Sequence, residues 1–215
     1  MAPPRVICLT NGIFEENCYV LGDPETAQAV LIDPGEDADL FLRRLDTERL
    51  TLGAIWLTHA HIDHVAGVAA VVQRTGVPVH LHPDDRQLYD HVSQQGAWLG
   101  VHAPQPPPPD HELADGGTVH VGSIEFEVRH VPGHSPGSVA FVGHGMALVG
   151  DLVFAGSVGR TDLPGGSAAT LLDSIRRHLL TLPGETVVYP GHGPETTVGI
   201  ERRTNPFLTG EIRLV

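Results

Sequence analysis

The 215-residue sequence lacks the features that define several classes of protein. Its two cysteines, Cys8 and Cys18, are too few for a disulfide framework, and because both lie in apolar stretches we expect buried thiols. No apolar run approaches the roughly 18 residues of a membrane-spanning helix. The first residues do not have the pattern of a secretory signal. These absences predict a cytoplasmic protein that does not associate with a membrane.

Positive charge is also scarce. Lysine is absent, and 13 arginines stand against 26 acidic residues, so the formal net charge is −13. A field of this sign repels phosphate backbones and argues against a nucleic-acid partner. Charged residues make up 18% of the chain and apolar residues 41%, a balance that excludes disorder driven by charge. The chain is long enough to bury a hydrophobic core.

Short apolar strands and amphipathic helices alternate along the chain. Strands are predicted at 6–9, 18–21, 29–32, 54–57, 77–81, 118–121, 124–131, 138–142, 147–149 and 187–189. Helices are predicted at 37–49, 65–74, 84–94, 168–180 and 197–203. Four consecutive prolines within residues 103–113 predict an extended surface strap between two halves of one domain. This order favours an α/β (α+β) fold in which helices cover sheets, with residues 1–215 as a single domain.

Four of the predicted strands are each followed directly by residues that can bind a metal ion. Residues 54–57 run into Thr58-His59-Ala60-His61-Ile62-Asp63-His64, and the strands that end at 131, 149 and 189 run into His134, Asp151 and His192. Ligands in α/β proteins bind at the carboxyl ends of strands, so we expect these loops to converge on one site.

The loop after residues 54–57 is the most informative of the four. In an extended loop, His59, His61 and Asp63 face one way, and the adjacent His64 points elsewhere. One short loop can therefore supply two ligands to one metal ion and two to a second. A structural alternative for Asp63 is the N-cap of the helix that follows.

Residues 58–64 resemble the T-H-x-H-x-D-H signature of the metallo-β-lactamase superfamily, and the glycine-flanked His134, Asp151 and His192 resemble its later ligand motifs. Members of this superfamily fold as a four-layer αβ/βα sandwich of two mixed β-sheets flanked by helices. The resemblance implies that fold here. It also implies that Asp63 and Asp151 are catalytic carboxylates.

The resemblance further implies a ligand set for two metal ions. His59, His61 and His134 would hold the first ion; Asp63, His64 and His192 would hold the second; Asp151 would bridge them. A set of imidazoles and carboxylates without thiolates suits zinc, iron or manganese, as one or two divalent ions per chain.

Within the superfamily, Asp151 argues against the β-lactamase branch, and the short acidic chain argues against the RNA-processing branch. Residues 17–21, 30–35, 150–166 and 201–208 resemble short bacterial glyoxalase II-like enzymes, the hydroxyacylglutathione hydrolases. The resemblance implies attack of metal-bound hydroxide on a thioester such as S-lactoylglutathione, so the expected partner is a glutathione-linked acyl-thiol. The chain ends before the C-terminal helical domain of the well-described enzymes, which leaves a homo-oligomer possible.

Arg160 lies in a loop where glyoxalase II carries a basic residue, and it is a candidate to bind a substrate carboxylate. The alternative is a structural pair with Asp162. Asp33 and His130 are candidates to orient metal-bound histidines, with a turn role as the alternative for Asp33. His80 and His82 are spaced like ligands, but they are interpreted as ordinary strand residues because no third partner is evident.

Two other functions remain open. A persulfide dioxygenase of the same superfamily would use one iron ion on His59, His134 and Asp151, a two-histidine, one-carboxylate set. Pro190-Gly191-His192 and the residues after Asp162 depart from that branch and favour the hydrolase. A metal-binding protein without catalysis is disfavoured because every expected ligand is present.

Overall fold

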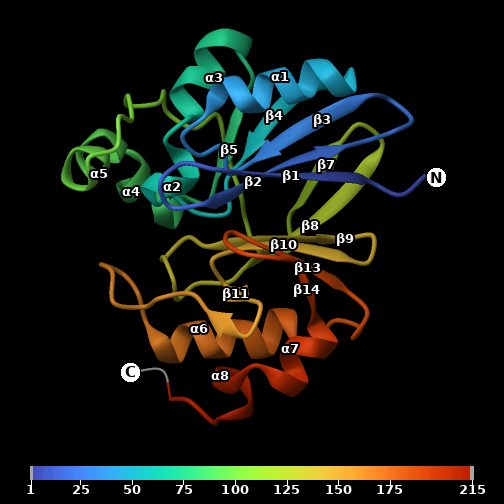
Figure 1. The fold of residues 1–215 in the computed structure, drawn as a ribbon, viewed down its shortest axis with the longest axis vertical. Coiled ribbons are helices and arrows are strands. Elements are labelled where there is room, and N and C mark those ends of the chain that lie inside the picture. The colour runs from blue at the N-terminus through green and yellow to red at the C-terminus, as the bar shows by residue number, and fades with distance from the viewer. Residues whose placement is uncertain (1, 214–215) are drawn as a thin grey trace.

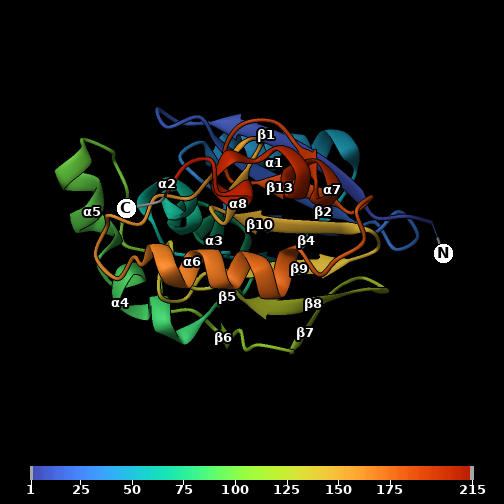
Figure 2. The same cartoon turned by 90° about the horizontal axis from the view of Figure 1, so that it is seen from below.

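Two β-sheets face each other in the structure, a computed structural model that describes residues 2–213. Helices cover the outer face of each sheet, as Figures 1 and 2 show, so the predicted four-layer αβ/βα sandwich is confirmed. No helix within this described range is both long and apolar enough to cross a membrane.

The first sheet runs from an antiparallel edge to a parallel edge. Its strands, in spatial order, are β1 (Arg5–Asn11), β2 (Glu16–Gly22), β3 (Gln28–Ile32), β4 (Thr51–Trp56), β5 (Val79–Leu81) and β6 (His111–Glu112). Strands β1 to β3 pair antiparallel, and β3 to β6 pair parallel. Parallel pairing places the loops that follow β4 and β5 at the same end of the sheet.

The second sheet is built from the C-terminal half of the described chain. Its strands, in spatial order, are β14 (Thr196–Thr197), β13 (Val187–Pro190), β10 (Met146–Gly150), β9 (Val139–Gly143), β8 (Ile124–His130) and β7 (Thr118–Val121). Strands β10 and β13 are parallel, so both carry their following loops to one end. A small hairpin of β11 (Val153–Phe154) and β12 (Ser157–Val158) follows β10.

Helices of the N-terminal half cover the first sheet or extend beyond its end, and those of the C-terminal half cover the second (Figure 1). The first group is α1 (Ala38–Glu48), α2 (Ile62–Val65), α3 (Val68–Thr75), the 3-10 turn η1 (Pro83–Asp85), α4 (Arg86–Tyr89) and α5 (Val92–Leu99). The second group is α6 (Ala168–Ser174), the π-helical turn η2 (Ile175–Leu179), α7 (Val198–Thr204) and α8 (Pro206–Thr209).

Helix α1 shows how the sequence specifies these layers. Asp37 caps its first turn by accepting the Leu40 N–H at 3.0 Å, and Arg49 ends it in a left-handed conformation. Phe41 and Leu45 lie on its buried side and pack in the core between the helices and the first sheet. Each side chain buried in this way contributes roughly 1.5–3 kcal/mol to stability.

A separate apolar cluster fills the space between the two sheets. Trp56 at the end of β4 packs against Phe126 of β8 and Phe141 of β9, with ring centroids 6.3 and 5.2 Å apart. Because only Leu57 separates Trp56 from the loop of residues 58–64, this packing fixes the position from which that loop leaves the sheet.

The structure corrects several details of the predicted elements. The helix predicted at 65–74 is broken at Gly67, where a Cβ would lie 2.2 Å from the Gly35 carbonyl oxygen. The helix predicted at 84–94 is divided into η1, α4 and α5. Cys18 is buried as expected, but the prediction for Cys8 is wrong, because that side chain is exposed on β1, an edge strand of the first sheet.

Candidate metal centre

The loops that follow β4, β8, β10 and β13 meet at one end of the sandwich. They bring together the seven side chains that the sequence singled out: His59, His61, Asp63, His64, His134, Asp151 and His192. Asp63 lies in the first turn of α2, whose N-cap is His61. The alternative interpretation of Asp63 as the helix N-cap is therefore wrong.

Three imidazoles form a first cluster. The Nε2 atom of His134 lies 2.8 Å from His61 Nδ1 and 3.2 Å from His59 Nε2. Nitrogen atoms that bind one tetrahedral metal ion lie about 2.0–2.1 Å from the metal and therefore roughly 3.4 Å from one another. The three nitrogens thus have the spacing of a common ligand set. All three side chains are buried.

A second cluster lies beside the first. The Nε2 atoms of His192 and His64 are 3.2 and 3.7 Å from Asp63 Oδ2. His64 is fully buried, whereas 26% of the His192 side chain and 18% of the Asp63 side chain are exposed. This second cluster is therefore the side of the centre that is more open to solvent.

Asp151 connects the two clusters. Its Oδ2 atom is 3.4 Å from His134 Nε2 in the first cluster, and its Oδ1 atom is 3.4 Å from His64 Nε2 in the second. Its Oδ2 atom is also 3.7 Å from His192 Nε2. One carboxylate thus approaches donors of both clusters.

Two buried atoms of the centre have no hydrogen-bond partner among residues 2–213: His64 Nε2 and Asp151 Oδ1. Buried polar atoms without partners are costly and uncommon in folded proteins. The two atoms lie 3.4 Å apart, so one cation at this place would satisfy both. The donor set and these two atoms therefore fit divalent metal ions.

The electrostatics of the first cluster agree with this fit, and those of His64 show that the carboxylates beside it favour a positive charge there. Burial, together with the neighbouring imidazoles, lowers the pKa of His59 well below its usual value and lowers that of His61 to about 3. Both rings are therefore neutral near pH 7 and offer lone pairs to a cation. For His64, burial also acts to lower the pKa, but the Asp63 and Asp151 carboxylates outweigh it and raise that pKa well above the usual value.

Hydrogen bonds behind the ligands set their orientation. Asp33 Oδ2 is 3.0 Å from His64 Nδ1 and accepts the Thr58 hydroxyl at 2.5 Å, and that hydroxyl oxygen is 3.0 Å from His59 Nδ1. These contacts occupy the Nδ1 atoms and leave the Nε2 atoms aimed at the centre. Asp33 therefore lies where a residue that orients metal ligands would lie.

Backbone carbonyls play the same part for two other histidines. The Arg160 carbonyl lies 2.8 Å from His134 Nδ1, and the Phe14 carbonyl lies 3.1 Å from His192 Nδ1. The Arg160 side chain is exposed and makes two hydrogen bonds of 2.7 Å to Asp162. The structural Arg160–Asp162 pair considered from the sequence is thus present.

Asn17 supports the loop that carries His192, a role that sequence reasoning did not assign. Its amide donates to the Pro190 and Gly193 carbonyls at 3.2 and 2.8 Å, and the Tyr19 hydroxyl donates to the Pro190 carbonyl at 2.7 Å. The one available signal was that Asn17 begins the segment 17–21, which resembles glyoxalase II-like enzymes.

Glycine is required at position 191 of the same loop because the backbone there comes close to the centre. A Cβ there would lie 2.2 Å from Asp151 Oδ1 and 2.7 Å from His64 Cε1. Any side chain at this position would displace two of the candidate ligands.

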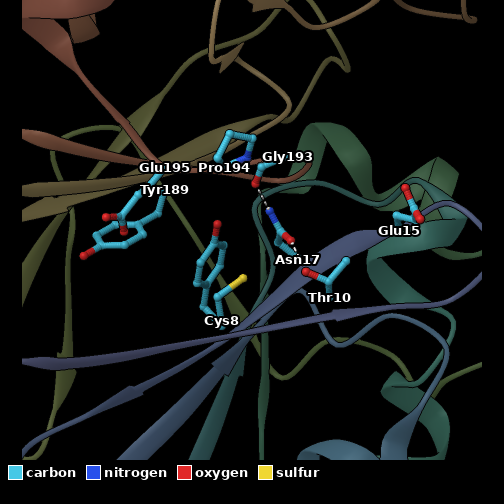
Figure 3. A pocket seen from close by; sticks show the side chains of 9 residues that line it. Cys8, Thr10, Glu15, Asn17, Tyr189, Gly193, Pro194 and Glu195 are labelled. Carbon is cyan, nitrogen blue, oxygen red and sulfur yellow. Dashed lines mark hydrogen bonds between the residues drawn. The ribbon is translucent and has the colours of Figure 1, made fainter.

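A cavity of about 440 Å³ adjoins the same loop on another side (Figure 3). Cys8, Asn17 and Tyr189 are among its lining residues, and Figure 3 shows the Asn17 amide reaching the Gly193 carbonyl. The seven candidate ligands do not line it. The cavity is therefore distinct from the metal centre.

His82, Asp84 and His130 form a third group of possible ligands near the surface. The two imidazole rings are stacked, with centroids 4.0 Å apart and planes inclined by 13°, so their lone pairs do not converge. His82 Nδ1 accepts the Asp84 N–H at 3.3 Å, and His130 Nε2 is 2.8 Å from the Pro136 carbonyl oxygen. These contacts explain the group as local structure.

Comparison with known proteins extends these observations. A family model described as the metallo-beta-lactamase superfamily matches residues 11–192. Hydroxyacylglutathione hydrolase GloC of Haemophilus influenzae is 36% identical over 202 residues, which cover 92% of this chain and 95% of that protein.

Three solved structures are also similar over most of the chain. The BLEG-1 B3 metallo-beta-lactamase has a TM-score of 0.89 and 40% identity, covering 96% of this chain and 100% of its own. The di-iron-bound form of TTHA1623 has a TM-score of 0.87 and 46% identity, covering 94% and 100%. ETHE1 from Myxococcus xanthus has a TM-score of 0.81 and 31% identity, covering 96% and 85%.

Proposed function

The chain belongs to the metallo-beta-lactamase superfamily, and we propose that it is a metal-dependent hydrolase that cleaves thioesters such as S-lactoylglutathione. The observation that carries the proposal is Asp151, whose two oxygens each lie 3.4 Å from a histidine nitrogen of a different cluster. The similarity to GloC, whose name describes a hydroxyacylglutathione hydrolase, supports the substrate class.

We propose that one or two ions of zinc, iron or manganese occupy the centre. The first cluster would hold one ion, the second cluster the other, and Asp151 would contact both; the seven ligands are His59, His61, His134, Asp63, His64, His192 and Asp151. When bound, such ions supply Lewis-acid activation of water and of a carbonyl group near neutral pH.

The two catalytic carboxylates are Asp63 and Asp151. Burial acts to raise their pKa values, but the neighbouring histidines, with His64 foremost and His192 beside it, together outweigh burial and lower both pKa values, so both carboxylates are ionised at neutral pH. In hydrolysis a C–O bond forms between water and the thioester carbonyl, the C–S bond breaks, and the thiolate takes up the proton that water loses. Asp63, the more exposed carboxylate, is placed to pass that proton.

Arg160 is the candidate to bind a carboxylate of the substrate. Its guanidinium is exposed and pairs with the Asp162 carboxylate, so a substrate carboxylate would displace Asp162 or use the remaining guanidinium donors. The carbonyl of the same residue contacts His134, so the side chain belongs to a loop fixed beside the first cluster.

Steady-state hydrolysis of S-lactoylglutathione by purified protein, with metal content measured on the same sample, tests the proposal. We expect turnover with about two ions per chain, because the two clusters together can hold two ions. A metal-loaded sample that turns over no acyl-thiol would refute it. A chromogenic cephalosporin belongs in the same assay, because a similar structure is described as a B3 metallo-beta-lactamase.

Persulfide dioxygenase activity is the second candidate. His59, His134 and Asp151 lie together, with 3.2 Å between the two histidine Nε2 atoms and 3.4 Å from His134 to Asp151. The similarity to ETHE1 favours this alternative. About one iron ion per chain, no thioester turnover and oxygen uptake with glutathione persulfide would support it over the hydrolase.

A further inference from the structure

Asp85 is a fully buried carboxylate that belongs to neither cluster. It lies in η1, just beyond β5, between two loops that carry ligands of the first cluster. Its Oδ2 atom accepts the Ala60 N–H at 2.9 Å and the Ser135 hydroxyl at 2.8 Å, and its Oδ1 atom accepts the Gly137 N–H at 2.6 Å. One side chain thus joins the two loops.

The partners of Asp85 adjoin the ligands in sequence. Ala60 lies between His59 and His61, and Ser135 directly follows His134. The three histidines of the first cluster are therefore attached to backbone that is hydrogen-bonded, directly or through a serine hydroxyl, to a single carboxylate. A shift of one loop relative to the other would separate His134 Nε2 from its two neighbours.

The contact between Asp85 and the loop that follows His134 is also tightly packed. A Cβ on Gly137 would lie 2.5 Å from the Asp85 nitrogen, so glycine is needed for the loop to come this close. The Ser135 hydroxyl is further held by the Ser138 hydroxyl at 2.7 Å. Donors on both oxygens of Asp85 leave little freedom for the carboxylate to reorient.

We propose that Asp85 is a positioning residue for the first metal cluster, which it assembles by fixing the separation of residues 59–61 from His134. The proposal rests on the metal binding of the proposed function. Asp85 acts through backbone and a serine hydroxyl, whereas Asp33 acts by direct contact with His64. Its expected effect is therefore on the affinity of the first cluster for metal.

The test is metal binding by Asp85→Asn without any substrate. The amide has a single acceptor oxygen, so its NH₂ group would face an N–H or hydroxyl donor and at least one link between the loops would be lost. In cadmium-substituted protein, ¹¹³Cd NMR gives a signal for each site. We expect the affinity of the first cluster to fall about 10–100-fold while the second site keeps its ion.

Asp23→Asn is the matched control. Asp23 is equally buried and accepts four hydrogen bonds, from Glu25, Thr26 and twice from Ser123, at 2.8–2.9 Å, but in a turn that carries no candidate ligand. We expect this variant to lose thermal stability and to keep both cadmium signals. Ser135→Ala removes one link to Asp85 and should weaken the first site by less than Asp85→Asn does.

Two results would overturn the proposal. One is a first-site affinity that stays at the wild-type value in folded Asp85→Asn and Ser135→Ala. The other is an equal loss at both sites, which would mark Asp85 as a general stabilising residue. A wild-type protein that binds cadmium at both sites but hydrolyses no thioester would refute the proposed reaction and leave the role of Asp85 testable, whereas a wild-type protein that binds no metal would refute both.

Discussion

At the scale of single residues, Asp151 makes the strongest prediction. Asp151→Asn keeps the shape of the side chain but removes the charge that faces both clusters. We expect thioester hydrolysis to fall by at least about 100-fold and the metal content to drop below that of the wild type. Activity and metal analysis on the same sample measure both effects.

Asp173→Asn is the control for this change, because Asp173 is an exposed carboxylate paired with Arg177 on the surface at 3.0 Å. It should leave metal content and turnover unchanged. Full activity in Asp151→Asn would contradict the assignment of Asp151 as the bridging carboxylate.

Arg160 gives a prediction about substrate binding. Arg160→Gln keeps the backbone carbonyl that contacts His134 but removes the guanidinium. If the guanidinium binds a substrate carboxylate, KM for S-lactoylglutathione should rise about tenfold, corresponding to about 1.4 kcal/mol, with kcat little changed. Steady-state kinetics measure KM and kcat for this variant, with Arg177→Gln at an exposed surface position as the control. A fall in kcat at unchanged KM would argue against this role.

At the scale of the elements, the turn between β2 and β3 joins the two sheets through Asp23. Its carboxylate accepts the backbone N–H and the hydroxyl of Ser123, in the turn between β7 and β8, at 2.8 and 2.9 Å. These bonds, with those from Glu25 and Thr26, lower the pKa of Asp23 below its usual value. The turn is therefore a contact between sheets that depends on an ionised carboxylate.

A pH dependence of stability follows from that lowered pKa. The folded state stabilises the ionised carboxylate of Asp23 more than the unfolded state does. The contribution of this carboxylate to folding stability is therefore present above the ordinary pKa of about 3.9 and is lost progressively as the pH falls below about 4. Asp23→Asn should melt at a lower temperature than the wild type at pH 7, and the difference should shrink toward pH 3. Thermal melts from pH 7 to pH 3, with exposed Asp46→Asn as control, measure this difference in melting temperature. A difference that stayed constant over this range would contradict the prediction.

The elements also show how far sequence reasoning reached. Strand positions and the loops after them were predictable because apolar runs end at glycine and at ligand-type residues such as His134 and Asp151. The π-helical turn after α6 was not, because its residues continue an ordinary helical pattern. The exposure of Cys8 depends on which strand lies at the edge, and local sequence does not determine that.

The supporting contacts were the least predictable part of the site. Asp85 lies 25 residues from Ala60 and 50 from Ser135, so no local pattern links them. A buried aspartate in a turn looks the same in sequence as an exposed one, such as its neighbour Asp84. Ligand residues have a motif because the metal demands particular atoms, whereas their supports require only some acceptor at the right place.

At the scale of the whole molecule, metal binding couples to folding stability. The candidate ligands come from four separate loops, so an unfolded chain does not bring them together. Removal of metal by a chelator should lower the free energy of unfolding by about 2.7 kcal/mol relative to protein kept at a free metal concentration 100 times the Kd. Urea unfolding with and without chelator measures this, and identical curves would contradict metal binding by the folded state.

The strap within residues 103–113 divides the candidate ligands into two groups that are synthesised one after the other. Its Gln105 and Pro107 contact Tyr89, and it joins α5 to β6 of the first sheet. The chain passes to the second sheet only after Glu112, so the prediction of a strap between the two halves is wrong. Four candidate ligands precede the strap and three follow it. During synthesis the four candidate ligands before the strap therefore emerge from the ribosome before the other three, so the first cluster can be complete once His134 has emerged, whereas the full set of seven exists only after synthesis has passed His192.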